Sequence, residues 1–97
     1  NFNPMSLDKL INQGATIIDV RSPMEFAGGS VPGAINIPLN EVSTRVEEFT
    51  SMEGPLVLCC MSGNRSGQAC AFLGAQGIEC YNGGSWYDVN ALVPEQG

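Results

Sequence analysis

The stretch PLVLCCMSGNRSG, residues 55–67, decides the fold of this chain. An apolar run ends at Cys60, a short polar loop follows, and Arg65 stands where a new helix begins. A strand that ends at a thiol presents it at the edge of a sheet, where the next helix offers unpaired backbone N–H groups and a partial positive charge. Both features favour the thiolate, and Arg65 adds a permanent cation. The stretch therefore predicts nucleophilic chemistry by Cys60 on an anionic substrate.

The composition limits the number of domains, the partners and the catalytic groups that this chain can have. The chain has 97 residues, enough for one core, so we expect a single domain over residues 1–97. Four basic residues against ten acidic ones give a net charge of −6, which argues against nucleic acid and anionic membranes as partners. No histidine is present, so Cys60 must be activated by its surroundings. Ser62, Gly63 and Asn64 are small or turn-prone, and the loop can therefore point its amides inward.

The cysteines favour free thiols over a disulfide framework or a metal site. They are Cys59, Cys60, Cys70 and Cys80, and their spacing contains no C-x2-C pair of the kind that binds zinc. We therefore expect no metal and, because free thiols suit a reducing compartment, a cytoplasmic protein. The chain begins at Asn1, so the periplasm fits if a signal peptide was removed. No apolar run approaches the roughly 20 residues of a membrane span.

Apolar and helical segments alternate along the chain. Strands are predicted over residues 16–20, 34–37, 56–59 and 78–81, and helices after Ser6, after Ser22, from Asn40 to about residue 54, over 66–75 and over 85–92. Within the helix over 66–75, Ala69, Phe72 and Leu73 should face inward, and Gly83-Gly84 should form a hinge or a turn. This order predicts an α/β fold, a mostly parallel sheet of four to five strands with helices on both faces and a ligand site at the carboxyl ends of the strands.

Four segments, in chain order, resemble the signatures of one family. IDVR at 18–21, followed by Glu25-Phe26, is similar to its first signature, and VPGAINIP at 31–38 is similar to its second. CMSGNRS at 60–66 is similar to its active-site loop, and GGSW at 83–86 resembles its carboxyl-terminal signature. The chain thus resembles a single-domain rhodanese, a member of the thiosulfate and persulfide sulfurtransferases.

The resemblance implies a reaction. Cys60 would attack the outer sulfur of a small anionic donor such as thiosulfate and become a persulfide, which passes its sulfur to cyanide, a small thiol or a protein thiol. No metal or organic cofactor is needed. The amides of the loop would stabilise the thiolate and the persulfide, and Arg65 would orient the leaving anion. The loop residues so assigned are Met61, Ser62, Gly63, Asn64 and Ser66.

Supporting roles are expected for Asp19, Arg21 and Glu25. Arg21 can pair with Glu25, four residues further on, and so hold the loop that follows the first strand. Many relatives carry a histidine just before the second signature, where this chain has Ser30. That difference bears on the rim of the site and on substrate preference rather than on the nucleophile.

Two other functions stay open. Cys59 precedes Arg65 by five intervening residues, the spacing of cysteine phosphatases and arsenate reductases, whereas Cys60 precedes it by the four of sulfurtransferases. Side chains alternate along a strand, so only one of the adjacent cysteines can face the loop, and we predict Cys60. Cys59 is then a small buried apolar residue or a resolving thiol. The remaining alternative is a sulfur-carrier or redox-sensing module without turnover.

Overall fold

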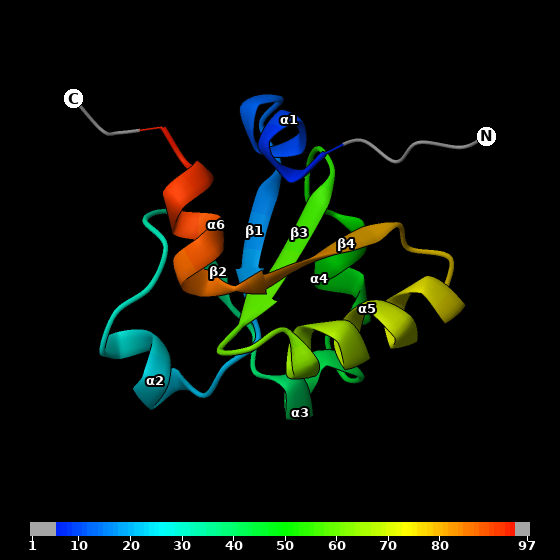
Figure 1. Cartoon of the computed structure of the whole chain (residues 1–97). Coiled ribbons are helices and arrows are strands. Elements are labelled where there is room, and N and C mark those ends of the chain that lie inside the picture. Colours follow the sequence, from blue (N-terminus) through cyan, green and yellow to red (C-terminus); the bar gives the residue numbers. More distant parts are fainter. Residues whose placement is uncertain (1–5, 95–97) are drawn as a thin grey trace.

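A parallel sheet forms the centre of the molecule (Figure 1), for which a computed structural model describes residues 6–94. Its strands are β1 (Thr16–Asp19), β2 (Ile35–Asn36), β3 (Leu56–Cys60) and β4 (Cys80–Ser85). They lie in the order β2-β1-β3-β4, and every neighbouring pair is parallel. The predicted α/β fold is confirmed, with four strands in the sheet. β3, which ends at Cys60, is flanked on both sides and is therefore a central strand.

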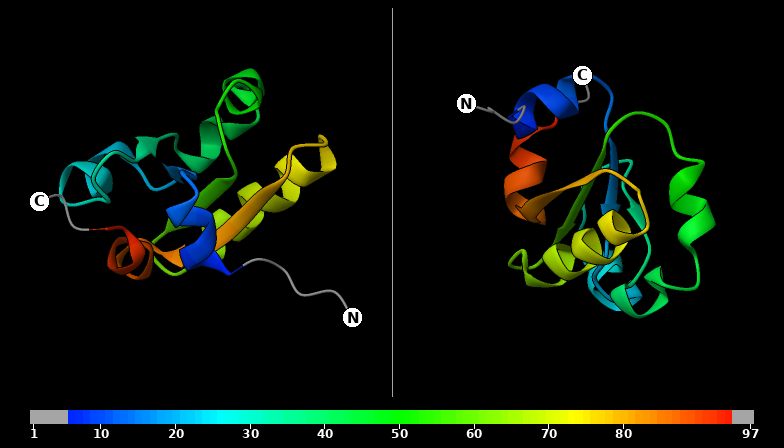
Figure 2. Two further views of the ribbon diagram at one scale, coloured as in Figure 1. Left: turned by 90° about the horizontal axis from the view of Figure 1, so that it is seen from above. Right: turned by 90° about the vertical axis from the view of Figure 1, so that its right-hand side faces the viewer.

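Helices cover both faces of the sheet (Figure 2). On one face lie α1 (Leu7–Asn12) and α6 (Trp86–Leu92). On the other lie α3 (Leu39–Val42), α4 (Val46–Thr50) and α5 (Asn64–Ala75), and α2 (Pro23–Ala27) follows the carboxyl end of β1. No helix among residues 6–94 is long and apolar enough to cross a membrane.

Alternation along β3 divides the core into two apolar clusters. Leu58 and Cys60 belong to the cluster beneath α3, α4 and α5. Val57 and Cys59 belong to the cluster beneath α1 and α6, which also contains Val89. Successive side chains of a strand point to opposite faces, so the two adjacent cysteines are separated by the sheet itself. The prediction that they face opposite sides is confirmed.

One predicted helix is divided in the structure. The helix expected from Asn40 to about residue 54 breaks into α3 and α4, and Pro38 rather than Asn40 occupies the position before the first turn. At the break, the hydroxyl of Thr44 donates a hydrogen bond to the carbonyl of Glu41 at 3.1 Å. Arg45, which follows, has a non-helical φ of −124° and separates α3 from α4.

The carboxyl-terminal strand also differs from its prediction. β4 begins at Cys80 and runs through Gly83 and Gly84, where the sequence predicts a hinge or a turn. A Cβ atom on Gly83 would lie 2.7 Å from Val89 Cγ2 and 2.9 Å from Val57 Cγ1. Glycine is therefore required here because β3 and α6 approach the strand too closely for a side chain, not because the chain turns.

Helix α5 starts earlier than predicted, at Asn64, and Gly63 occupies its N-cap position with a left-handed φ of +98°. Ala69 and Leu73 face the core as predicted. The prediction that Phe72 faces inward is wrong, because that side chain is 36% exposed. It lies one residue before Leu73 and therefore falls at the margin of the narrow buried stripe.

Candidate active site

The thiol of Cys60 lies at the carboxyl end of β3, against the start of α5. Its Sγ accepts hydrogen bonds from the N–H of Gly63 at 3.0 Å, the N–H of Ser66 at 3.4 Å and the hydroxyl of Ser66 at 3.4 Å. The left-handed backbone at Gly63 turns the loop so that its amide points back at the sulfur. The structure thus brings the predicted nucleophile and two predicted loop residues together.

These donors lower the pKa of the Cys60 thiol. Burial by itself raises the pKa, but hydrogen bonds from the Ser66 hydroxyl and from the backbone N–H groups of Ser66 and Gly63 outweigh it, and the pKa falls below its ordinary value. The N-terminal dipole of α5, a helix of 12 residues, acts in the same direction. Cys60 therefore gains thiolate character in a site that contains no histidine.

The neighbouring thiol, Cys59, has the opposite character. It is buried on the other face of the sheet, in the cluster that contains Leu10 and Val89. Burial raises the pKa of Cys59 to about 12, and the negative charge of Asp19 contributes to the rise. Such a thiol is a small apolar core residue at neutral pH. The arrangement that a phosphatase would need, with Cys59 facing the loop, is absent from the described structure.

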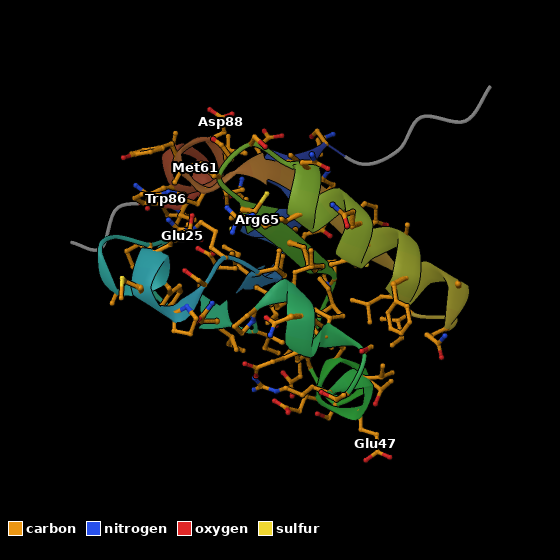
Figure 3. All side chains as sticks on the ribbon, turned by 90° about the horizontal axis from the view of Figure 1, so that it is seen from below. Glu25, Glu47, Met61, Arg65, Trp86 and Asp88 are labelled. Atoms are coloured by element: carbon orange, nitrogen blue, oxygen red, sulfur yellow. The ribbon has the colours of Figure 1, made fainter. Side chains whose placement is uncertain are left out.

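Arg65 does not stand free over the thiol. Its Nη1 and Nη2 donate hydrogen bonds to Glu25 Oε1 and Oε2 at 2.8 and 3.1 Å (Figure 3), and Glu25 lines the same cleft as Met61. The Arg65 guanidinium, together with the Ser22 backbone N–H, lowers the pKa of the Glu25 carboxyl to about 2. Glu25 also completes a capping box with Ser22 at the start of α2. The ion pair therefore links α2 to the loop and balances the charge of Arg65.

Arg21 has a different partner from the one predicted. It pairs with Asp19, with an Nη2–Oδ2 distance of 2.8 Å, and the expected pairing with Glu25 is wrong. Arg21 also donates from Nη2 to the carbonyl of Gly29 at 2.6 Å, and its guanidinium lies 4.8 Å from the centre of the Trp86 ring. Both members of the pair are almost fully buried. A buried guanidinium needs several close partners, and Asp19, Gly29 and Trp86 supply them.

Comparison with known proteins agrees with this geometry. The family described as Rhodanese-like domain matches residues 3–88, most of the chain. The chain belongs to the rhodanese-like domain family. A solved structure titled "rhodanese with anions from E. coli" superimposes on it with a TM-score of 0.72 and 33% sequence identity, covering 87% of this chain and 100% of that one.

Several curated relatives of this rhodanese-like domain carry sulfurtransferase names. "Sulfurtransferase" of Allochromatium vinosum is 39% identical over 61 residues, which is 63% of this chain and 56% of that protein. "Thiosulfate sulfurtransferase GlpE" of Pseudomonas syringae pv. syringae is 32% identical over 75 residues, 77% of this chain and 70% of that protein. The chain thus spans little more than half the length of the Allochromatium protein. These similarities support sulfur transfer as the general chemistry.

The remaining predicted loop residues lie at the surface of the rhodanese-like domain. Met61 is 46% exposed, and Ser62 and Asn64 are exposed as well. The Ser62 hydroxyl accepts a hydrogen bond from the Asn64 N–H at 3.4 Å, which tightens the loop. Met61 lines a cleft of about 220 Å³ whose other walls include Trp86. The Met61 and Asn64 side chains form the rim of the site, whereas the Ser62 backbone N–H also helps to lower the pKa of Cys60.

Asn82 is the residue at this site that sequence reasoning missed. Its side chain contacts both Gly63 and Ser66, although it comes from β4. An asparagine just before Gly83-Gly84 reads as part of a turn, and no local pattern connects it to a loop 16 or more residues earlier. Within residues 6–94, no group of three histidine, cysteine, aspartate or glutamate side chains is placed to hold a metal ion.

Proposed function

We propose that this domain transfers sulfane sulfur through a persulfide on Cys60. The main support for this proposal is the environment of the Cys60 sulfur, which receives hydrogen bonds from two backbone N–H groups and one hydroxyl. These donors stabilise a negatively charged sulfur before and after it accepts a second sulfur atom. Two-step covalent catalysis needs such an activated nucleophile and, for this reaction, no metal or organic cofactor.

In the first step, the Cys60 thiolate attacks the outer sulfur of a small anionic donor such as thiosulfate. The sulfur–sulfur bond of the donor breaks, its electron pair leaves with sulfite, and Cys60 carries a persulfide anion. In the second step, cyanide, a small thiol or a protein thiol attacks the outer sulfur of the persulfide. The product is thiocyanate or a new persulfide, and the Cys60 thiolate is restored.

The sequence predicts that Arg65 orients the leaving anion. In the structure Arg65 is paired with Glu25, and this pairing points to a different role. Because Glu25 already neutralises the guanidinium, Arg65 holds the loop in place, and the backbone amides carry most of the interaction with the anion. At the N-terminus of α5 these backbone N–H groups all point toward the position of the anion. Met61, Ser62 and Asn64 are exposed and form the rim that the donor passes.

The test is sulfur loading of the reduced protein. Incubation with thiosulfate should add one sulfur atom to the peptide that contains Cys60, and cyanide should remove it as thiocyanate. Cys60→Ala should abolish the gain, whereas Cys59→Ala, its matched control, should retain it. A gain that persists in Cys60→Ala would contradict the proposal. A persulfide that forms but never turns over with cyanide or a thiol would instead indicate a sulfur carrier or redox-sensing module.

A further inference from the structure

Asn82 uses both ends of its side-chain amide at the active-site loop. Its Oδ1 accepts hydrogen bonds from the Ser66 hydroxyl at 2.7 Å and from the Gly84 N–H at 3.0 Å, and its Nδ2 donates to the Gly63 carbonyl at 2.9 Å. An exposed asparagine usually satisfies its amide with water, but this one binds two residues that also contact the Cys60 sulfur.

The fold explains how this side chain reaches the loop. In the sheet Asn82 pairs with Leu58, whose side chain faces α5, and Asn82 therefore points to the same face as Cys60. Gly67, in the first turn of α5, leaves the space that the amide occupies, because a Cβ atom there would lie 3.1 Å from Asn82 Nδ2. The register shift that follows Leu58 then places the Gly84 N–H against the same amide oxygen.

The Ser66 hydroxyl stands between two acceptors. Its oxygen lies 2.7 Å from Asn82 Oδ1 and 3.4 Å from Cys60 Sγ, and a hydroxyl has only one proton to donate. When Cys60 is a neutral thiol, Ser66 can donate to Asn82 and accept the S–H proton of Cys60. When Cys60 is a thiolate, the hydroxyl proton turns to the sulfur, and Asn82 keeps its bond from the Gly84 N–H. Asn82 therefore competes with the sulfur for one proton while it holds the loop through Gly63.

We propose that Asn82 is a positioning residue for the Cys60 nucleophile. It orients the Ser66 hydroxyl and anchors the Gly63 peptide. In this way it sets both the geometry of the hydrogen-bond donors around the Cys60 sulfur and the pH at which the thiolate forms. The role of Asn82 in sulfur transfer rests on the proposed function. Its effect on the ionisation of Cys60 does not, because ionisation is measurable without any sulfur donor.

Asn82→Asp tests the effect on ionisation. The carboxylate accepts the Ser66 proton more strongly and adds a negative charge, and both changes oppose the thiolate. The bond to the Gly63 carbonyl is lost in Asn82→Asp and in Asn82→Ala alike. We expect the pH midpoint of iodoacetamide alkylation, followed by mass spectrometry of the Cys60 peptide, to rise by about one unit, a tenfold loss of thiolate below both midpoints. Asn90→Asp, which adds the same charge at an exposed position of α6, should leave the midpoint unchanged.

Asn82→Ala separates positioning from a structural effect. Removing the competing oxygen frees the Ser66 proton for the sulfur, so the alkylation midpoint should stay at or below that of the wild type. The loop loses its anchor, however, and persulfide formation per thiolate should slow by about tenfold. Unfolding temperatures of both variants report any loss of folding.

The outcomes decide between the roles. An Asn82→Asp midpoint within about 0.3 units of the wild type, or an equal rise in Asn82→Ala and Asn82→Asp, would overturn the inference, because a merely structural residue behaves in that way. If the wild-type protein accepts no sulfur at all, the proposed function fails. The alkylation profile would still show whether Asn82 controls the ionisation of Cys60.

Discussion

Glu25 and Arg65 are 40 residues apart in the chain, and their side chains meet through two hydrogen bonds of 2.8 and 3.1 Å. Glu25 belongs to α2 and Arg65 to the first turn of α5. The pair therefore connects the segment after β1 to the start of α5, which lies against Cys60. This ion pair stabilises the loop between β3 and α5, and it neutralises the Arg65 guanidinium beside the active site.

Glu25→Gln should make the protein less stable in a manner that depends on pH. The folded protein holds the pKa of Glu25 near 2 instead of 4.5, chiefly through Arg65, so the carboxylate favours the folded state above pH 4.5. This contribution is lost as the pH falls from 4.5 toward 2. Urea unfolding at a series of pH values should show a difference from wild type at pH 7 that shrinks toward pH 2.5. Glu47→Gln, an exposed change at a residue without an ion pair in the described structure, should show no such trend.

The two adjacent cysteines should react with alkylating agents at very different rates. Hydrogen bonds lower the pKa of Cys60, whereas burial raises that of Cys59 to about 12. Brief treatment with iodoacetamide near pH 7, followed by peptide mass analysis, should find the label on Cys60 and none on Cys59. After unfolding in guanidinium, both should be labelled. Preferential labelling of Cys59 in the folded protein would contradict the orientation of β3.

Ser66→Ala should raise the pKa of Cys60. The variant removes the hydroxyl that donates to the sulfur at 3.4 Å but keeps the backbone N–H, and the loss of one donor to a thiolate is worth about one pH unit. Persulfide formation at pH 7 should fall by up to about tenfold and recover as the pH rises. Ser51→Ala, which removes a surface hydroxyl bonded to the Glu48 carbonyl, is the control. A loss of rate that does not recover at high pH would point to a misplaced loop.

Replacing each of two glycines by alanine should change the free energy of unfolding in opposite directions. Gly83→Ala would place its Cβ 2.7 Å from Val89 and 2.9 Å from Val57, so we expect a loss of about 1–3 kcal/mol from the free energy of unfolding. Gly74 lies in α5, and apart from its chain neighbours and the backbone of that helix nothing lies within 4 Å of the position of a Cβ, so Gly74→Ala should add about 0.5–1 kcal/mol. Urea denaturation measures both. A neutral Gly83→Ala would show that β4 and α6 are packed less closely than described.

Much of the site could be predicted from the sequence because its determinants are local. The apolar run before Cys60, the small residues after it and the start of α5 are consecutive, and the period of two along β3 separates Cys60 from Cys59. The capping pattern at Ser22 and Glu25 likewise marks the start of α2 through residues three positions apart.

Only the tertiary structure decided which distant side chains meet. From the sequence, Glu25 is predicted to pair with Arg21, four residues away. In the structure Arg21 is buried against Asp19, and Glu25 pairs with Arg65 instead. Asn82 joins the site because parallel pairing of β3 with β4 places it beside the first turn of α5. Local patterns determine where strands, helices and the reactive loop begin, whereas ion pairs and amide bonds between distant segments depend on how those elements pack in three dimensions.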